Sequence, residues 1–195
     1  MKNALLALVL TLSPALAAAE KLSLAEVSAY LTAMQTAQAT FTQINGDGTK
    51  STGTLFIKRP GRMRIEYDPP EKALVLASAG AVAIYDPKSG PTPETYPLRK
   101  TPLSIILAQQ VDLAQARMVV GHDYNGTATT ITAQDPEHPE YGNIQLMFTD
   151  APVALRQWVL NDDGGNSTTV VLGAMTVGET LRDSIFAIEG ADSQR

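Results

Sequence analysis

Short segments in which apolar and polar residues alternate fill most of the sequence beyond residue 39, and only a few residues separate most of them. A period of two places successive side chains on opposite faces of a strand. Parallel pairing of consecutive strands needs a crossover of a dozen or more residues, whereas antiparallel pairing needs only a tight turn. For the six segments over residues 39–98, which short connections join, the pattern therefore predicts an antiparallel meander. The expected strands cover residues 39–44, 52–59, 62–67, 73–78, 81–86, 94–98, 117–124, 127–134, 143–150, 153–160 and 168–177.

Two segments depart from this alternation and predict helices. Ser23 and Glu26 match a capping box, and apolar residues then recur every three or four positions, which predicts a helix over 23–36. A second helix is predicted over 103–116, after a Thr-Pro start. Its apolar side is expected to carry Leu103, Ile106 and Leu107. A long antiparallel sheet must curl, close or be covered, so a helix in mid-chain is well placed to cover it. A short helical turn and a final strand are expected over 181–189.

The N-terminal residues predict a signal peptide. Lys2 is followed by an apolar run over 4–12, which is too short to form a membrane-spanning helix. Small residues follow, and cleavage is expected after Ala17 or Ala19. We therefore expect residues 1–19 to be removed and residues 20–195 to form a single exported domain.

Composition excludes several classes of function. The chain has no Cys, which excludes disulfides, thiol catalysis and Cys-bound zinc. Its formal net charge of -5 makes nucleic acid an unsuitable partner. The motifs of hydrolases, zinc proteases, phosphate loops and dinucleotide-binding proteins are absent from the sequence. We therefore predict a protein that is not an enzyme and has no cofactor, although a pair of carboxylates brought together by the fold stays an alternative.

A metal site would need residues that converge in one loop. Glu137, His138 and Glu140 stand close together in the sequence, in a Pro-rich acidic stretch. They would have to point at one another to bind a metal ion. A solvated loop is the simpler interpretation, so we predict no metal site.

Four basic residues gather in seven positions of this acidic chain: Lys58, Arg59, Arg62 and Arg64. They could form an anion site, a solvated strand face, or a set in which one arginine has a special role. Alternation scatters the four over both faces of the predicted strands, which argues against a shared anion site. Arg62 and Arg64 alternate with Glu66 on one face, and this pattern predicts a solvated face.

Arg59 differs because it shares a strand face with Leu55 and Ile57. A guanidinium on an apolar face costs several kcal/mol unless it is paired, but its five donors can bridge backbone carbonyls. Arg59 either reaches solvent at the sheet edge or acts as a latch at the rim of an apolar cavity. Alternation alone favours the edge. The face that would line such a cavity carries Leu55, Ile57, Met63, Ile65 and Tyr67.

Several segments occur in an order that resembles a known family. They are FTQ (41–43), STGTLFIKRPGRMRIEY (51–67), LVLASAGAVAIYDP (74–87) and KTPLSIIL (100–107), and the most specific part is Gly53-x-Leu55-x-x-Lys58-Arg59-Pro60. In this order they resemble the LolA-type periplasmic carriers of outer-membrane lipoproteins. The resemblance implies an unclosed antiparallel barrel with a helical lid over an apolar cavity. It also implies that Arg59 hydrogen-bonds to the lid and holds the empty carrier closed. Where the family often has a Phe four residues after this Arg, the chain has Met63.

The function implied by the resemblance is transport. A carrier of this type shields the acyl chains of lipid-modified proteins and takes them from the inner membrane to the outer membrane. An inner-membrane ABC transporter would load it, and an outer-membrane receptor would unload it. We expect a monomer in the periplasm. Two alternatives stay open: a periplasmic lipid-binding or lipoprotein-sensing module on the same half-barrel, and an all-β domain with a sealed core or a hidden hydrolase site.

Overall fold

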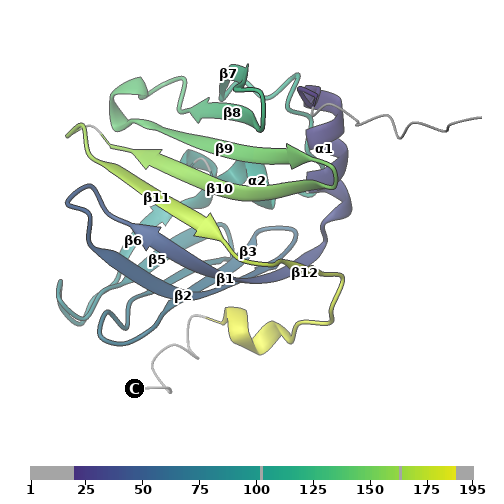
Figure 1. The fold of residues 1–195 in the computed structure, drawn as a ribbon. Coiled ribbons are helices and arrows are strands. Elements are labelled where there is room, and N and C mark those ends of the chain that lie inside the picture. The colour runs from purple at the N-terminus through teal and green to yellow at the C-terminus, as the bar shows by residue number, and fades with distance from the viewer. Residues whose placement is uncertain (1–19, 102, 163, 188–195) are drawn as a thin grey trace, which may run out of the picture.

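The protein is built on one large antiparallel sheet (Figure 1). The computed structural model describes residues 20–101, 103–162 and 164–187, so the predicted signal peptide and the end of the predicted final strand lie outside the described residues. The strand order is β6-β5-β4-β3-β2-β1-β11-β10-β9-β8-β7, and β12 pairs with β1. The strands are β1 (Thr36–Ile44), β2 (Lys50–Lys58), β3 (Arg62–Tyr67), β4 (Leu74–Ser78), β5 (Ala81–Tyr85), β6 (Glu94–Pro97), β7 (Val119–Tyr124), β8 (Thr129–Gln134), β9 (Asn143–Asp150), β10 (Val153–Asn161), β11 (Ser167–Leu172) and β12 (Thr176–Val177).

The antiparallel meander predicted for the six strands of residues 39–98 is confirmed as β1 to β6, and strand ends throughout the sheet move by up to three residues. β7 to β11 form a second meander, which joins the first where β1 pairs with β11. One difference lies near the C-terminus, where the single strand expected over 168–177 divides into β11 and β12. A short break separates the two, and both pair with β1. The expected helical turn near residue 181 is the 3-10 turn η3 (Asp183–Phe186).

The sheet is open, and its two edge strands are consecutive in the chain. β6 and β7 stand at opposite ends of the strand order. The connection between them, residues 98–118, is called the lid segment below. It holds the 3-10 turn η1 (Leu98–Lys100) and helix α2 (Leu103–Leu107). The sheet curves so that α2 lies behind β10 as seen in Figure 1.

Helix α1 (Leu24–Ala33) begins as predicted and ends early. The capping box is present: the Glu26 amide donates to Ser23 Oγ at 3.2 Å, and the Ser23 amide donates to Glu26 Oε2 at 2.7 Å. The predicted end at residue 36 is wrong, because Thr36 already pairs with Lys58 in the ladder of β1 and β2. Strand pairing therefore overrides helical periodicity at this point.

Side chains from both halves of the sheet, from α1 and from the lid segment meet in one buried apolar cluster, called the interior cluster below. Its members include Leu31, Leu55, Ile57, Met63, Ile106, Leu107, Phe148 and Trp158. Each of these side chains is at most 4% exposed. Burial of this kind stabilises the fold by about 25 cal/mol for each Å² of apolar surface removed from water. The concave face of the sheet is therefore filled by its own side chains and by the helices.

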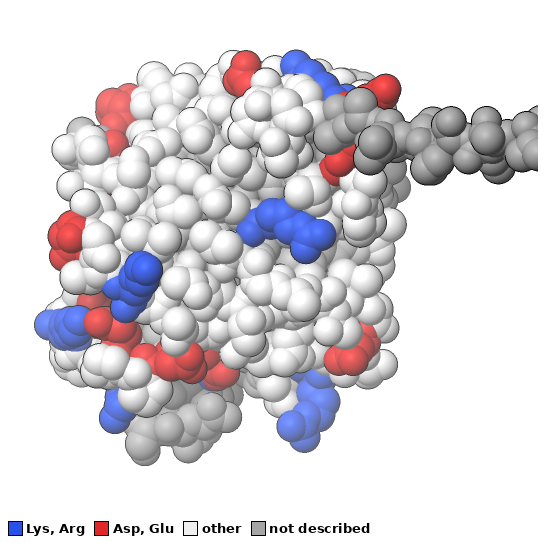
Figure 2. Space-filling view, in the orientation of Figure 1, with Lys and Arg blue, Asp and Glu red and all other residues white. Residues whose placement is uncertain are grey.

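The opposite face of β9, β10, β11 and β1 carries Thr, Gln and Val side chains and few charges, and Val171 is 39% exposed. Thr42 pairs with Val171, which in turn pairs with Gln157, and Val159 pairs with Thr169. Figure 2 shows that Lys, Arg, Asp and Glu side chains are sparse across this side of the molecule. Uncharged β-branched residues suit a pleated, half-buried surface.

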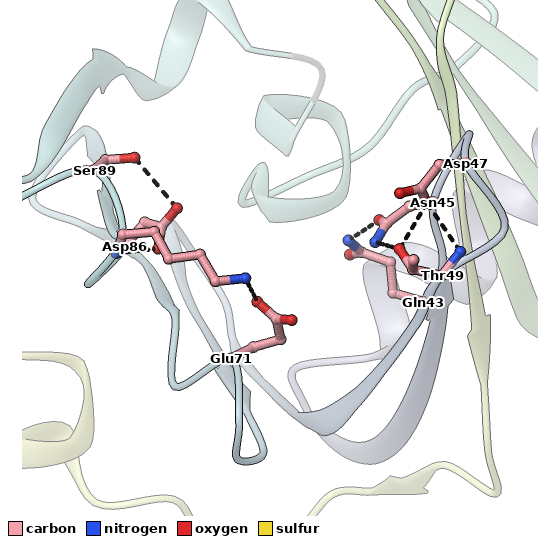
Figure 3. A network of polar contacts seen from close by, with 8 residues as sticks. Gln43, Asn45, Asp47, Thr49, Glu71, Asp86 and Ser89 are labelled. Carbon is pink, nitrogen blue, oxygen red and sulfur yellow. Dashed lines mark hydrogen bonds and ion pairs between the residues drawn. The ribbon is translucent and has the colours of Figure 1, made fainter.

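Side-chain hydrogen bonds fix the turns at one end of the sheet (Figure 3). In the turn between β1 and β2, Gln43 Nε2 donates to Asn45 Oδ1 at 2.7 Å, and Asn45 Nδ2 donates to Thr49 Oγ1 at 2.9 Å. In the region of β3 to β6, Lys88 Nζ donates to Glu71 Oε2 at 2.5 Å. The short side chains satisfy backbone and side-chain groups locally, as expected for turn residues.

Candidate functional site: a buried arginine between the sheet and the lid segment

Arg59 lies just beyond the end of β2 and is only 4% exposed. Its backbone amide donates to the Gln35 carbonyl at 2.8 Å, which holds the residue against the start of β1. Leu55 and Ile57 precede it on the same face of the strand and belong to the interior cluster. Arg59 therefore occupies an apolar face and does not extend into solvent. The edge position favoured by alternation alone is wrong.

The guanidinium of Arg59 bridges the ends of the two helices. Nε donates to the carbonyl of Ala108 at 3.0 Å, and Nη2 donates to the same oxygen. Nη2 also donates to the Gln109 carbonyl at 3.5 Å, and Nη1 donates to the Met34 carbonyl at 3.4 Å. Met34 is the residue that caps α1, and Ala108 follows α2. Carbonyl groups at helix ends lack partners within the helix and favour a nearby positive charge.

Burial lowers the pKa of Arg59 from its ordinary value. Desolvation disfavours the charged form, whereas the carbonyl oxygens around it provide acceptors for the guanidinium donors. An arginine stays protonated in such a site because its ordinary pKa is far above neutrality. Arg59 is therefore a buried cation that is held by backbone carbonyls.

The helix predicted over 103–116 begins at Leu103 as expected, but its predicted end is wrong, because α2 ends at Leu107. The Gly61 amide donates to the Leu107 carbonyl at 2.8 Å, and Arg59 occupies the next two carbonyls. Donors from the turn after β2 thus bond to the carbonyls that would otherwise accept hydrogen bonds from the next turn of a longer helix. The carbonyls at the end of α2 become a contact surface between the lid segment and the sheet.

The remainder of the lid segment is fastened to α1. The Val111 amide donates to Thr32 Oγ1 at 3.2 Å, and the Leu113 amide donates to Ser28 Oγ at 3.0 Å. Leu113 is 1% exposed, so its amide would lack a partner without Ser28. Sequence reasoning missed Ser28 and Thr32, because on an amphipathic helix both resemble ordinary small residues of the packed face.

The five residues predicted to line a cavity share one face and join the interior cluster. Leu55, Ile57 and Met63 are at most 1% exposed, and Ile57 pairs with Met63 across β2 and β3. Ile65 and Tyr67 are partly buried and pack against the same cluster. From the lid segment, Ile106 and Leu107 are fully buried there and Leu103 is partly buried. The structure thus brings the predicted sheet and lid residues together in a closed arrangement.

Tyr67 adds a polar group at the far end of this face. Its hydroxyl donates to Gln43 Oε1 at 2.6 Å, and its ring packs edge-on against Phe41 with centroids 5.1 Å apart. Burial, with a smaller contribution from the negative charge of Glu71, raises the pKa of Tyr67 to about 12. The hydroxyl is therefore neutral at physiological pH and connects the apolar face to the hydrogen-bonded turn of β1 and β2.

The other basic residues of the cluster lie on the opposite face, under a C-terminal segment. Lys58 Nζ and Arg62 Nη1 both lie 2.6 Å from Asp183 Oδ1. Arg64 is 6% exposed, donates from Nη1 to the Ile185 carbonyl at 3.0 Å and pairs with Glu66. The prediction of a solvated face is wrong for Arg64, because a segment more than a hundred residues away covers it.

This covering segment, residues 181–186, is called the C-terminal strap below. Phe186 is 1% exposed and Leu181 is 9% exposed, so both anchor the strap by burial. The hydrogen bond from Lys58 is the main cause that lowers the pKa of Asp183, and the charges of Arg62 and Lys58 act in the same direction. Sequence reasoning missed Asp183 because its partners are distant in the chain.

An apolar groove of about 380 Å³ lies along the lid segment. Ile105, Val111 and Met118 line it together with polar residues such as Asp112 and Arg117. The outer surface of the lid segment is therefore hollowed where these side chains meet.

The loop considered for a metal site is arranged differently. His138 Nδ1 lies 3.1 Å from Glu140 Oε1, and the His138 ring stacks on Tyr141. Among the described residues, no group of three or more His, Asp or Glu side chains is placed to hold a metal ion. In the same residues, none of the helices has the length and apolar character needed to cross a membrane.

Comparison with known proteins gives a consistent picture. The model of the family "Outer membrane lipoprotein carrier protein LolA" matches residues 32–189. An outer-membrane lipoprotein carrier protein of Azotobacter vinelandii is 24% identical over 197 residues, covering 95% of this chain and 93% of that protein. One from Coxiella burnetii is 32% identical over 98 residues, 46% of each chain.

Among solved structures, a putative outer-membrane lipoprotein-sorting protein domain from Vibrio parahaemolyticus has the same fold. The TM-score is 0.50 at 11% identity, over 85% of this chain and 97% of that one. The match of the family model covers the sheet, the lid segment and the C-terminal strap. The chain belongs to the LolA family of outer-membrane lipoprotein carrier proteins.

Proposed function

We propose that this protein is a periplasmic carrier that shields the acyl chains of lipoproteins and takes them from the inner membrane to the outer membrane. The observation that carries the proposal is the position of Arg59. Its side chain fastens the lid segment over an apolar sheet face by hydrogen bonds to backbone carbonyls, without an ion pair. Membership of a carrier family supports the same conclusion. Residues 20–195 act as one domain after removal of the signal peptide.

The need for such a carrier follows from the hydrophobic effect. Each methylene left in water costs about 0.8 kcal/mol, so a sixteen-carbon chain needs roughly 10 kcal/mol or more of alternative burial. Displacement of the lid segment exposes the sheet face that carries Leu55, Ile57 and Met63. The acyl chains then replace Ile106 and Leu107 as the partners of that face.

Arg59 acts as a latch that stabilises the closed position of the lid segment and still allows the segment to open. Arg59 holds carbonyls at the ends of α1 and α2, and opening exchanges these hydrogen bonds for contacts with water. A hydrogen bond of this kind contributes about 0.5–3 kcal/mol net, so a few of them give a barrier that cargo burial offsets. Met63 belongs to the same interior cluster as Ile106 and Leu107 of the lid segment, and its flexible thioether adapts to acyl chains of different shape.

Opening and closing of the lid segment imply one partner that loads the carrier and another that unloads it. A lipid-modified protein enters from an inner-membrane ABC transporter, and an outer-membrane receptor accepts it because the closed, empty state is restored at the same time. The carrier works as a monomer and hydrolyses nothing itself.

The test is the release of newly made lipoproteins from spheroplasts. Added mature protein is expected to release radiolabelled lipoproteins from the inner membrane in a complex with the carrier. If all of them stay in the membrane, the proposal fails. Arg59→Leu is expected to bind lipoprotein but to pass less of it to outer-membrane vesicles, because the closed state no longer competes with cargo.

Arg62→Leu is the matched control for Arg59→Leu. It makes the same substitution three positions later, on the opposite face of the sheet, where the side chain contacts Asp183. Delivery by this variant is expected to equal that of the wild type. Equal delivery by Arg59→Leu would show that Arg59 is a structural residue. A dye-binding assay tests whether the protein has an accessible apolar cavity at all. Displacement of a bound apolar dye by fatty acids indicates a cavity, whereas a protein with a sealed core binds no dye.

A further inference from the structure

The chain immediately before α1 is tied to β7 and β8. Lys21 Nζ donates to the carbonyl of His122 at 2.8 Å, and His122 Nε2 lies 2.8 Å from the Leu22 carbonyl oxygen. The Leu22 amide donates to Thr129 Oγ1 at 2.8 Å, and Thr129 is 1% exposed. These contacts fix Lys21 and Leu22 directly before the cap of α1.

Glu20 makes a further contact at the end of β9. Its backbone nitrogen lies 2.8 Å from Asp150 Oδ2. The other carboxylate oxygen of Asp150 accepts from the Ala151 amide at 2.9 Å, so Oδ2 is directed at Glu20. The hydrogen bond from Glu20 is the main cause that lowers the pKa of Asp150.

The backbone nitrogen of Glu20 belongs to the peptide bond at one of the two predicted cleavage sites of the signal peptide. Small residues precede it, and they allow processing after Ala17 or Ala19. Hydrolysis of the Ala19–Glu20 bond by one water molecule leaves a carboxylate on Ala19 and an amino group on Glu20. The Glu20 nitrogen then changes from a neutral amide to an ammonium group, next to a carboxylate. Cleavage after Ala17 would leave a neutral amide at this point.

We propose that the mature chain begins at Glu20 and that its α-ammonium group forms an ion pair with Asp150. The pair exists only after processing, and it fastens the chain before α1 to the end of β9. Its stabilisation is present above the ordinary pKa of an Asp side chain, about 4, because Asp150 must be ionised. It is lost as the α-amino group deprotonates, above about pH 8.

Other ionisable groups of this region have different partners. Lys21 contacts the His122 carbonyl, the His122 ring contacts the Leu22 carbonyl, and Arg156 Nε donates to Thr149 Oγ1 at 3.1 Å. Replacement of Asp150 by Asn therefore removes the acceptor charge and leaves these contacts in place.

Mass spectrometry of the exported protein, expressed with its own signal peptide, is the first test. The expected mass is that of residues 20–195, and the mass of residues 18–195 would overturn the proposal. The second test uses the purified mature protein with its amino groups ¹³C-methylated, and follows the N-terminal signal by NMR as pH rises. The pKa of this amine is expected to be higher in the wild type than in Asp150→Asn. Equal values would overturn the ion pair.

Asp86→Asn is the control, because it removes the same charge from a turn after β5, near the other edge of the sheet. The N-terminal pKa of this variant is expected to match the wild type, and a fall as large as that of Asp150→Asn would contradict a specific pair. Neither measurement involves lipoprotein, so the outcome is independent of the proposed carrier function.

Discussion

Arg59 donates two hydrogen bonds, from Nε and Nη2, to the carbonyl of Ala108, forty-nine positions along the chain. A third donor of the same side chain contacts the carbonyl of Met34. One guanidinium therefore joins the sheet, the end of α1 and the end of α2. The lid segment is held by a planar group with donors in fixed directions, which a flexible lysine does not reproduce.

Arg59→Leu is expected to loosen the lid segment locally. Loss of the donors leaves the carbonyls of Ala108 and Met34 without partners, at a cost of about 1–3 kcal/mol for each acceptor that stays buried. Hydrogen exchange measured by mass spectrometry should become faster in residues 103–113 and stay unchanged in β9 and β10. Arg62→Leu should leave exchange in the lid segment unchanged, and equal acceleration in both variants would contradict a latch.

Gly53→Ala is expected to destabilise the centre of the sheet. A Cβ at this position would lie 2.0 Å from the Glu66 carbonyl oxygen and 2.7 Å from the Phe41 ring. Overpacking of this kind costs about 1–3 kcal/mol, which urea unfolding followed by tryptophan fluorescence should detect. Gly46→Ala is the control, because its Cβ would meet neighbours at 3.5 Å or more. A midpoint for Gly53→Ala equal to that of Gly46→Ala would refute the close approach.

The stability of the protein should fall between pH 10 and 12 because of Tyr67. Its pKa is raised to about 12 in the folded state, whereas an unfolded tyrosine has a pKa near 10. The unfolded state therefore releases its proton first as pH rises, and up to about 2–3 kcal/mol of stability is lost in this interval. Tyr67→Phe should remove this part of the pH dependence in urea unfolding. Tyr141→Phe, at an exposed position, should retain it.

The C-terminal strap should detach when Asp183 loses its charge. Lys58 and Arg62 lower the pKa of Asp183, so the contact is present above the ordinary pKa of an Asp side chain and is lost as pH falls through the lowered value. Asp183→Asn should speed hydrogen exchange in residues 181–187 at neutral pH. Glu179→Gln removes one negative charge nearby without touching these contacts and should leave exchange unchanged. Equal protection in all three proteins would show that burial of Phe186 alone holds the strap.

Local patterns predicted the sheet well because strand alternation is a property of neighbouring residues. The shared face of Leu55, Ile57 and Arg59 is confirmed for the same reason. The length of α2 was mispredicted because Arg59 and Gly61, more than forty residues earlier, supply the partners that end it. Arg64 was assigned to solvent because its cover, Ile185, is encoded 121 positions later.

The candidate site was only half visible in the sequence. The donor, Arg59, carries a recognisable side chain, whereas its acceptors at Met34, Ala108 and Gln109 are backbone carbonyls. Any residue type provides such a carbonyl, so no sequence pattern marks these positions. The fold alone decides which carbonyls a buried guanidinium meets.

The open order of the sheet has a mechanical consequence. β6 and β7 are its two edges, and the lid segment is the stretch of chain that connects them. Movement of this segment away from the concave face separates no pair of hydrogen-bonded strands. The molecule can therefore enlarge its interior while the number of its interstrand hydrogen bonds stays constant. The contacts that resist enlargement are the backbone hydrogen bond from Gly61 to Leu107 and the side-chain hydrogen bonds of Arg59, Ser28 and Thr32. Single substitutions of these three side chains can adjust the resistance without altering the strand pairing.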